Sequence, residues 1–312
     1  MKTSTAFAYD TAFSRNIGLV SKDEQCRLRE TCVAVPGLGG VGGAHIHALA
    51  RMGIGSFRLA DLDTFDVVNI NRQFGATMET VGRSKTDVSA ESILAINPDA
   101  KITQFDDGIT PENIDAFLSG VDIVIDGIEF FRMDTRRMLY AACRERKIPV
   151  INAGPIGYGA AVLVFLPEGP SFEDHFGLTD DMTKAEQLLA LALGLAPRLK
   201  SDIDPASINI ESEKGPALAS ACFLCAAAAA TEVLKLVCKR GTCTTAAYGR
   251  YYDPYRGAVY ALKRRPALTR TLFGRLLRWL SFRQVPAFKA MHLRELAERK
   301  NQTTPRAVSA VL

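Results

Sequence analysis

The chain contains 312 residues, 47% of them hydrophobic, and its 38 basic and 34 acidic residues give a formal net charge of +4. This length can bury a full core, and we expect one large domain or one and a half. The N-terminal segment MKTSTAFAYDTAF lacks the basic and apolar regions of a secretory signal. The longest apolar run, residues 217–230, is shorter than the roughly 18 residues that span a bilayer. We therefore expect a cytoplasmic protein that is neither secreted nor membrane-spanning.

Residues 1–30 predict a helical arm, and the chain then alternates between short apolar runs and amphipathic runs. The apolar runs predict strands at 31–35, 57–60, 101–105 and 122–126. The runs that follow them predict helices at 41–52, 84–96, 111–118 and 133–146. Repeated strand-then-helix units with short connections are typical of a parallel sheet covered by helices.

The pattern changes in the second half of the chain. Further strands are predicted at 150–153, 157–167, 251–255 and 257–262. Because 157–167 has no helix directly after it and the last two form a hairpin, the sheet should continue with antiparallel strands. Residues 169–216 form a long crossover insertion, and 215–241 predict one long buried helix. The fold class is therefore Rossmann-like α/β, a mostly parallel sheet with helices on both faces.

The C-terminal tail, residues 263–312, differs from the rest of the chain in charge. It holds 12 of the 38 basic residues and only 2 of the 34 acidic ones. Its segment RTLFGRLLRWLSF places apolar residues at helical spacing with arginines around them. Such a basic amphipathic helix can lie on an anionic membrane, dock on a partner protein or pack on its own domain. The sequence leaves these three alternatives open.

A glycine-rich loop, AVPGLGGVGG, joins the first predicted strand to its helix. It contains five glycines, of which Gly37, Gly39 and Gly42 form a GxGxxG pattern and Gly40 lies within it. Backbone N–H groups at a helix N-terminus attract phosphate oxygens where no side chain screens them. Asp61 follows 19 positions after Gly42, where an acidic residue can accept hydrogen bonds from ribose hydroxyls. The loop predicts a bound nucleotide, and alone it also suits NAD or FAD.

A polar cluster after the second predicted strand favours ATP. The segment DLDTFDVVNINRQF carries Asp61, Asp63, Asn69 and Arg72, and VGRSK brings Lys85 at the start of the next helix. An enzyme that cleaves ATP between the α and β phosphates needs positioned cations and a metal to neutralise the leaving pyrophosphate. Hydride transfer needs no such cluster.

Together the runs GLGGVGG, DLDTFDVVNINRQF, VGRSK and INPDA resemble the ThiF/MoeB branch of the ubiquitin-activating-enzyme-like adenylyltransferases. The resemblance covers roughly residues 11–241 and implies ATP-dependent adenylation of a carboxylate with release of pyrophosphate. The substrate it implies is the C-terminus of a small ubiquitin-like or sulfur-carrier protein, or of a peptide. The acyl adenylate then passes to a sulfur or nitrogen nucleophile. We expect no nucleic-acid partner.

The resemblance also implies roles for particular residues. At the nucleotide it places Asp61 against the ribose, Asn69, Arg72 and Lys85 around the phosphates, and Asp63 in the same loop. Arg15, in FSRNIGL, matches an arginine that reaches into the partner subunit's active site, and this implies a homodimer. The catalytic set is then Arg15, Arg72, Lys85 and Glu129.

The segment after the fourth predicted strand departs from the family pattern. Where the family has an aspartate, DGIEFF places Glu129, which would support magnesium and catalysis, and Asp126 is the alternative magnesium ligand. Glutamate keeps the charge but adds a methylene, so geometry is changed rather than chemistry. Val68 stands where a serine is common, which removes one hydroxyl from the phosphate region.

The seven cysteines do not form the family's two zinc-binding CxxC pairs. Only Cys222 and Cys225 form a CxxC, and we expect two thiols on a buried helix and no structural zinc. No cysteine lies between Cys143 and Cys222, where relatives that form a thioester keep their nucleophile, so we expect adenylation without one. His175 lies in this region, and a lone loop histidine is usually solvated rather than a catalytic base.

Two other functions remain open. Glu129, Val68 and the missing cysteine would suit a non-catalytic nucleotide-binding or scaffold protein. The glycine loop alone would suit an oxidoreductase that uses NAD or FAD. We weigh adenylation first, in a chain of three parts: an arm at 1–30, an adenylation domain at 31–262 and the tail at 263–312.

Overall fold

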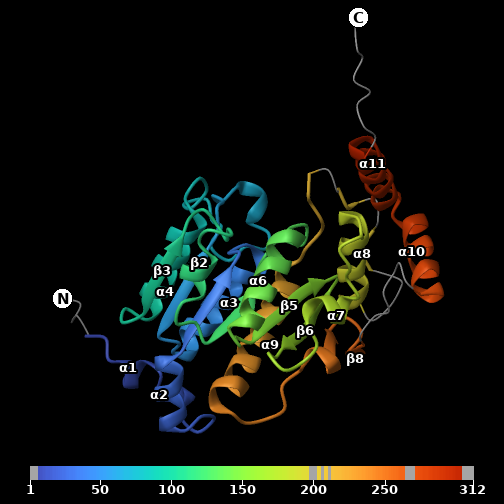
Figure 1. Ribbon diagram of the computed structural model, residues 1–312. Coiled ribbons are helices and arrows are strands. Elements are labelled where there is room, and N and C mark those ends of the chain that lie inside the picture. Colours follow the sequence, from blue (N-terminus) through green and yellow to red (C-terminus); the bar gives the residue numbers. More distant parts are fainter. Residues whose placement is uncertain (1–5, 197–201, 205–206, 210–211, 264–270, 304–312) are drawn as a thin grey trace, which may run out of the picture.

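The computed structural model describes residues 6–196, 202–204, 207–209, 212–263 and 271–303. Its centre is one eight-stranded sheet in the order β3-β2-β1-β4-β5-β6-β7-β8 (Figure 1). The strands are β1 (Cys32–Pro36), β2 (Ser56–Ala60), β3 (Lys101–Phe105), β4 (Ile123–Asp126), β5 (Val150–Ile156), β6 (Gly159–Phe165), β7 (Gly249–Asp253) and β8 (Ala258–Leu262). The first five are parallel, and β6, β7 and β8 are added antiparallel.

Helices precede, separate and follow these strands. Those before β5 are α1 (Tyr9–Ala12), η1 (Ser14–Asn16), α2 (Lys22–Glu30), α3 (Gly40–Met52), η2 (Val67–Asn69), α4 (Lys85–Ile96), α5 (Ile114–Leu118) and α6 (Met133–Glu145). Those after β6 are α7 (Phe172–Phe176), α8 (Lys184–Leu195), α9 (Ala219–Cys238), η4 (Ala246–Tyr248), α10 (Leu272–Gln284) and α11 (Pro286–Thr303).

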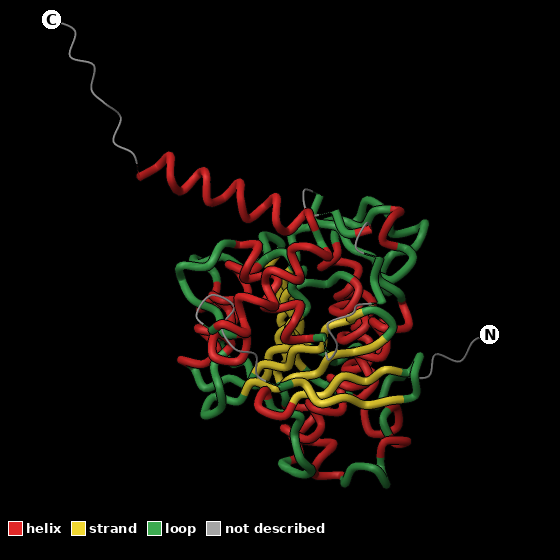
Figure 2. The backbone as a smooth tube through the Cα atoms, turned by 90° about the vertical axis from the view of Figure 1, so that its right-hand side faces the viewer, coloured by secondary structure: helices red, strands yellow, loops and turns green. Residues whose placement is uncertain are grey.

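The central parallel strands β1, β4 and β5 are largely buried on both faces, whereas the edge strand β3 is mostly exposed, and the buried side chains divide between two hydrophobic clusters. In β1, Val33 and Val35 join the cluster formed with α2, α3, α4 and α9, whereas Ala34 joins the cluster formed with α5, α6, α7 and α8. A continuous apolar run such as CVAVP is what a strand covered on both faces requires. Figure 2 shows the resulting layers, with the strands flanked by helices and α11 projecting from the body.

The predicted fold class is confirmed, but the sequence did not predict α7 or α11. The helix α7 has 5 residues and begins with a capping box between Ser171 and Asp174. The helix α11 begins at Pro286, directly after α10 ends at Gln284 and Val285 caps it. A proline at the first helical position starts a new helix rather than extending the previous one. The tail therefore folds as two helices.

Among the described helices, α9 is the one that is long and apolar enough to cross a membrane by length and composition. Its packing identifies it as a core helix. Cys225, Ala229 and Val233 are fully buried, and α9 contacts α3, β5 and β6. The buried helix predicted at 215–241 is thus confirmed, with its bounds at Ala219–Cys238.

Candidate nucleotide-binding site

The sheet has its topological switch point between β1 and β4. The chain passes from β1 to β2 on one side and from β4 to β5 on the other, so the loops that leave these two strands diverge and form a crevice. The two loops touch through their backbones: the Gly127 N–H donates to the Pro36 carbonyl oxygen at 3.0 Å. A Cβ on Gly37, which has a φ of +85°, would stand 2.1 Å from the Gly127 oxygen. Only glycine fits there.

The helix α3 presents its N-terminus to this crevice. Its N-cap is Gly39, which has no side chain to satisfy the first N–H groups of the helix. A Cβ on Gly42 would stand 1.8 Å from the Gly37 oxygen, so the turn closes because this position is glycine. An unscreened helix N-terminus in a glycine turn attracts phosphate. All four predicted glycines lie in this turn: Gly37, Gly39, Gly40 and Gly42.

Asp61 connects the glycine loop to β2. Its Oδ2 accepts the Leu38 N–H at 2.6 Å, and its Oδ1 accepts the Asp63 N–H at 2.9 Å. The side chain is 9% exposed. Burial raises the pKa of Asp61, although the Lys85 charge and these hydrogen bonds oppose the rise. The carboxylate is thereby fixed beside the first amides of the loop.

Lys85 lies between two carboxylates. It is the first residue of α4, and its Nζ lies 2.7 Å from Oδ2 of Asp63 and 3.8 Å from Oδ1 of Asp61. Only 7% of its side chain is exposed. A buried ammonium requires paired charge, and the two carboxylates supply it. The structure therefore brings Asp61, Asp63 and Lys85 together as one charge cluster.

Arg72 lies over the start of α3. A Cβ on Gly40 would stand 3.5 Å from Cγ of Arg72. The guanidinium donates to the Val68 carbonyl oxygen and to Oδ1 of Asn71. Within the described part of the chain it forms no ion pair with a carboxylate. The charge of Lys85 is thus matched by protein carboxylates, whereas among the described residues that of Arg72 is not.

Asn69 shapes the turn that carries Arg72. Its Oδ1 accepts the Asp66 N–H at 3.0 Å, and its carbonyl oxygen accepts the Arg72 N–H at 3.1 Å. The first bond belongs to the capping box of the short helix η2, in which the Asp66 side chain accepts the Val68 N–H, and the second continues the turn to Arg72. In this structure Asn69 therefore positions the backbone from which the Arg72 side chain projects.

Asp126 is buried at the end of β4 and fully engaged. Its Oδ1 accepts the Ile128 backbone N–H at 3.0 Å. Its Oδ2 accepts hydrogen bonds at 2.8 to 2.9 Å from the side chains of Arg136, Tyr140 and Asn152. A carboxylate offers about four lone-pair sites. In this conformation Oδ2 is fully occupied, and the side chain is 1% exposed, so Asp126 offers a metal ion no open approach.

Glu129 stands at the crevice and is held there by Arg136. Glu129 is exposed and lies two residues past Gly127, which touches the glycine loop. The Arg136 guanidinium donates to the carbonyl oxygens of three successive residues: Ile128, Glu129 and Phe130. The sequence reasoning missed Arg136, although a signal exists. Met133, Arg136 and Tyr140 share one face of α6, so a charge interrupts an otherwise apolar stripe.

These residues fit a magnesium ion that arrives with a nucleotide. The ion usually keeps several waters and is held by one or two carboxylates together with substrate phosphates. The exposed Glu129 carboxylate suits that mode of binding, whereas Asp126 is occupied. The described residues contain no group of three or more His, Cys, Asp or Glu side chains that could hold a metal alone.

Arg15 lies at the opposite end of α3 from the glycine loop. The arm that carries it is tied to the C-terminal end of the helix, where the Tyr9 hydroxyl donates to the Gly53 oxygen and Nδ2 of Asn16 donates to the Met52 oxygen. At 1.5 Å per residue, α3 rises about 18 Å between its ends. Within one chain, Arg15 therefore does not reach the glycine loop at the start of α3.

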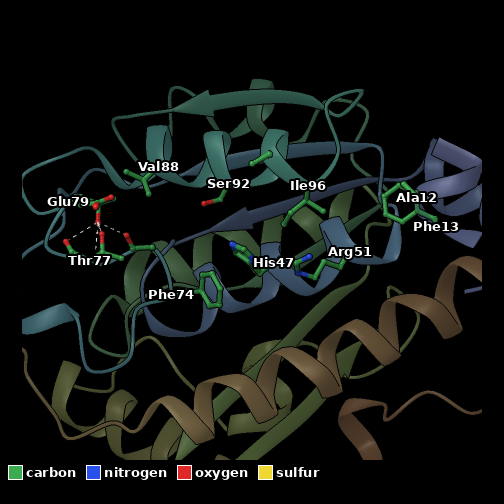
Figure 3. Close-up of a pocket in the computed structure, with 13 residues that line it drawn as sticks. Ala12, Phe13, His47, Arg51, Phe74, Thr77, Glu79, Val88, Ser92 and Ile96 are labelled. Atoms are coloured by element: carbon green, nitrogen blue, oxygen red, sulfur yellow. Dashed lines mark hydrogen bonds between the residues drawn. The ribbon is translucent and has the colours of Figure 1, made fainter. Parts of the chain in front are cut away.

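A hollow of about 730 Å³ lies between α3 and α4 (Figure 3). On α3, the His47 ring meets the Phe74 ring with centroids 3.7 Å apart. Burial, together with the Arg51 charge, lowers the pKa of His47 to about 4, so its ring is neutral at pH 7. None of the predicted site residues lines this hollow. The hollow is therefore distinct from the crevice at the glycine loop.

The predicted buried thiols are confirmed, and one of them lies at the site. Cys222 and Cys225 are both buried on α9. Sγ of Cys222 lies 3.0 Å from where a Cβ on Gly40 would stand, so α9 packs against the glycine loop, which the sequence did not predict.

The expectation of a solvated His175 is wrong. This histidine is fully buried because α7 turns it into the core against the Phe176 ring.

The fold and this loop define an open, doubly wound α/β protein with a glycine-rich helix N-terminus at its switch point, where such proteins commonly bind ligands. The chain belongs to the ThiF family, whose family model matches residues 13–270. The resemblance found in the sequence is thereby confirmed.

Curated relatives and solved structures place the chain in the same group. It is 41% identical over 150 residues to the tRNA threonylcarbamoyladenosine dehydratase of Haemophilus influenzae, a match that covers 48% of this chain and 57% of the relative. It is 33% identical over 157 residues to the sulfur carrier protein ThiS adenylyltransferase of Escherichia coli, which covers 50% and 62%. The crystal structure of E. coli tRNA N6-threonylcarbamoyladenosine dehydratase aligns with a TM-score of 0.55 and 28% identity, over 76% of this chain and 98% of that one. The chain thus spans less than two thirds of the length of these curated relatives.

Proposed function

We propose that the protein is an ATP-dependent adenylyltransferase that activates a carboxylate and releases pyrophosphate. The charge arrangement at the switch point carries this proposal. It combines a helix N-terminus without a capping side chain, Arg72 above it with no acidic partner among the described residues, and Lys85 clustered with two aspartates. The relative named as an adenylyltransferase supports the same chemistry.

In the proposed reaction a carboxylate oxygen of the substrate attacks the α-phosphorus of ATP. The bond from that phosphorus to the bridging oxygen breaks, and pyrophosphate leaves with the electron pair. Arg72 neutralises charge that develops on the phosphates, and Lys85 does so after turning from Asp63 to a phosphate oxygen. Asp61 accepts hydrogen bonds from the ribose. Glu129 would hold a magnesium ion, which adds positive charge at the pyrophosphate.

Exchange of labelled pyrophosphate into ATP, with candidate carboxylates present, tests the proposal. Arg72→Ala and Lys85→Ala should each lower exchange by about 10²- to 10³-fold, the usual loss when one positioned stabilising group is removed. Arg83→Ala is the matched control, because this nearby exposed arginine pairs with Glu91 and not with the cluster. Exchange that persists in both site variants contradicts the site assignment.

The exchange assay, together with measurements of ligand binding and melting temperature, separates the two other functions. ATP binding without exchange, for every carboxylate tried, would favour a nucleotide-binding scaffold. A rise in melting temperature with NADH but not with ATP would favour an oxidoreductase.

For the proposed adenylyltransferase we retain a cytoplasmic location and the division into arm (1–30), domain (31–262) and tail (263–312).

For the substrate we propose the C-terminal carboxylate of a small carrier protein or peptide, activated without a thioester on this chain. The sulfur-carrier adenylyltransferase among the relatives supports this class. A second candidate is the carboxylate of threonylcarbamoyladenosine on tRNA, which the dehydratase relative at 41% identity favours. Exchange that is stimulated by the modified tRNA and not by carrier proteins would select the second candidate and overturn the expectation of no nucleic-acid partner.

We further propose a homodimer in which Arg15 of one subunit reaches the site of the other. The position of Arg15 at the far end of α3 supports this arrangement. So does an exposed apolar surface around Arg72, where the Phe74 and Phe223 rings lie 6.1 Å apart. Its exposed side chains are Val67, Val68, Ile70, Phe74, Leu218 and Phe223. Exposed apolar side chains gathered in one region are typical of a protein interface.

A mixing experiment tests whether Arg15 acts between subunits. Arg15→Ala and Arg72→Ala should each be nearly inactive alone. After subunit exchange, about a quarter of the wild-type activity should return, because half of the dimers are mixed and one of the two sites in each is intact. No recovery, with mixed dimers confirmed by differential tagging, would place Arg15 outside the reaction or within its own subunit's site.

A further inference from the structure

The helix α10 turns the more apolar of its two sides away from the protein. On the inward side it buries Gly274, Leu277 and Phe282. On the outward side it exposes five large apolar side chains: Leu272, Phe273, Leu276, Trp279 and Leu280. At about 100° per residue these five fall within an arc about 120° wide, which we call the outer stripe. A helix that packed only on its own domain would bury this stripe.

The direction of the outer stripe is fixed by contacts on the other side of the helix. Arg278 forms an ion pair with Glu186 of α8, and Phe282 joins the hydrophobic cluster that α8 shares. The helix α11 supports this arrangement, since Arg299 donates to the Met182 carbonyl oxygen. Figure 1 shows both helices at the edge of the molecule beyond α8. Packing on its own domain, one of the three alternatives for the tail, is therefore found, but it leaves the outer stripe uncovered.

The charge of α10 indicates what covers the stripe. The helix contains no acidic residue and three arginines, of which Arg275 and Arg283 are exposed and Arg278 pairs with Glu186 on the inward side. The guanidinium of Arg283 lies over the Trp279 ring, 4.9 Å from its centroid. The whole tail is basic, with 12 of the 38 basic and 2 of the 34 acidic residues. Leucine, phenylalanine and tryptophan side chains flanked by arginines are typical of helices that lie in an anionic lipid interface.

We propose that the outer stripe of α10 inserts into the surface of an anionic phospholipid bilayer, with the helix axis parallel to the membrane. The apolar side chains enter the acyl boundary, and Arg283 extends to the phosphate groups. A nucleic acid would pair with the arginines but would leave the leucines in water. A second copy would bring two strongly basic tails together, which repel. The membrane satisfies both the apolar and the charged groups, and it holds the protein at a surface without a spanning helix.

The full chain carries its own reporter for this contact. Trp279 is the single tryptophan, so tryptophan emission reports on α10 without labelling. We expect a blue shift and co-sedimentation with vesicles of phosphatidylcholine and phosphatidylglycerol, and neither with phosphatidylcholine alone. High salt should reverse the binding, because screening weakens the attraction between arginines and lipid phosphates. Lipids with brominated acyl chains should quench the emission.

Two variants divide the interaction into its apolar and charged parts. Leu276→Glu should weaken partitioning by about tenfold or more, since it removes a buried leucine from the interface. Arg275→Gln should weaken it roughly fivefold, the effect of one basic residue near an anionic surface. Leu94→Glu is the matched control, because Leu94 is similarly exposed on α4 at the other end of the molecule. Circular dichroism and melting temperature confirm that each variant is folded.

Three results would overturn the proposal. The first is unchanged emission with anionic vesicles. The second is a blue shift without vesicles that grows with protein concentration, which would assign the stripe to a second copy. The third is a shift caused by tRNA and not by vesicles, which would assign the tail to nucleic acid. None of these depends on adenylation, so the outcome is independent of the proposed activity.

Discussion

The crevice at the switch point has a buried region beneath it and an open rim above it, and the two treat charge differently. Beneath it, Asp126 and Arg136 are 1% and 5% exposed at their side chains and are paired with each other. At the rim, Glu129 is exposed and Arg72 is partly exposed, and neither has an ion pair within the described part of the chain. Asp126 and Glu129 follow each other closely in the sequence, yet one is enclosed and the other is available.

The difference indicates that the buried region contributes mainly to folding and the rim mainly to catalysis. A buried ion pair gains little net free energy, but loss of one partner leaves an uncompensated charge in a low-dielectric interior. Changes beneath the crevice should therefore affect folding first. Charges at the rim are solvated without a ligand, so their removal should affect catalysis and leave the free energy of unfolding nearly unchanged. Each prediction below tests one side of this division.

Arg136→Ala should have the largest effect on folding. It leaves Asp126 as a buried, unpaired charge and removes the donor that holds the loop of Glu129. The free energy of unfolding should fall by about 3–5 kcal/mol, as measured by urea denaturation. The control is Arg137→Ala, the next residue of α6, whose partners Glu173 and Asp180 are 34% and 95% exposed at their side chains. That change should cost about 1 kcal/mol or less. Equal urea midpoints for the two variants would show that the buried network does not stabilise the fold.

His45, also beneath the crevice, should make stability depend on pH. It is 1% exposed, and burial lowers the pKa of His45 to about 4, with the Asp126 charge opposing the shift. Its pKa in the unfolded chain is about 6.5. The unfolded state therefore takes up a proton first as pH falls, and stability that is complete above pH 6.5 is lost toward pH 4. Urea unfolding at pH 7 and pH 5 should differ by roughly 2 kcal/mol from this group.

The matched variant for this effect is His45→Leu. Neither ring nitrogen of His45 has a hydrogen-bond partner among the described residues, so a leucine of similar size should keep the stability measured at pH 7. It should also remove the corresponding part of the loss at pH 5. A variant that loses as much stability as the wild type between these pH values would assign the dependence to other groups.

The glycine loop and the charge cluster at the switch point were predictable from the sequence, whereas the buried network around Asp126 was not. Gly37 and Asp61 lie in loops after parallel strands, Lys85 begins the helix after such a loop, and the carboxyl ends of these strands share one edge of the sheet. Chain order alone therefore placed them near one another. The partners of Asp126 come from α6 and β5 and meet only in three dimensions: Arg136, Tyr140 and Asn152. Periodicity gives a helix's buried face but does not show which distant carboxylate a buried arginine will meet.

The orientation of α10 in the tail is a second feature that sequence periodicity did not predict. Helical spacing over residues 270–282 predicted an amphipathic helix, and α10 at Leu272–Gln284 agrees with it. The usual inference from such spacing is that the apolar side faces the protein. The structure reverses this for α10, because Glu186 of α8 pairs with Arg278 and fixes the orientation. The ion pair of Arg278 and the packing of Phe282 hold this side of α10 against α8, and composition alone does not show such contacts.

Val68→Ser should have the smallest effect and is the finest test of the rim. This substitution restores the hydroxyl that the family commonly has at this position. Val68 is 61% exposed, and what it gives to Arg72 is its backbone carbonyl oxygen, which a serine supplies equally. The free energy of unfolding should change by no more than about 0.5 kcal/mol, and pyrophosphate exchange should stay at the wild-type rate. A rise in exchange of about tenfold, equal to roughly 1.4 kcal/mol of activation free energy, would show that a missing hydroxyl limits this site. The rim would then act through hydroxyl groups as well as through the charge of Arg72.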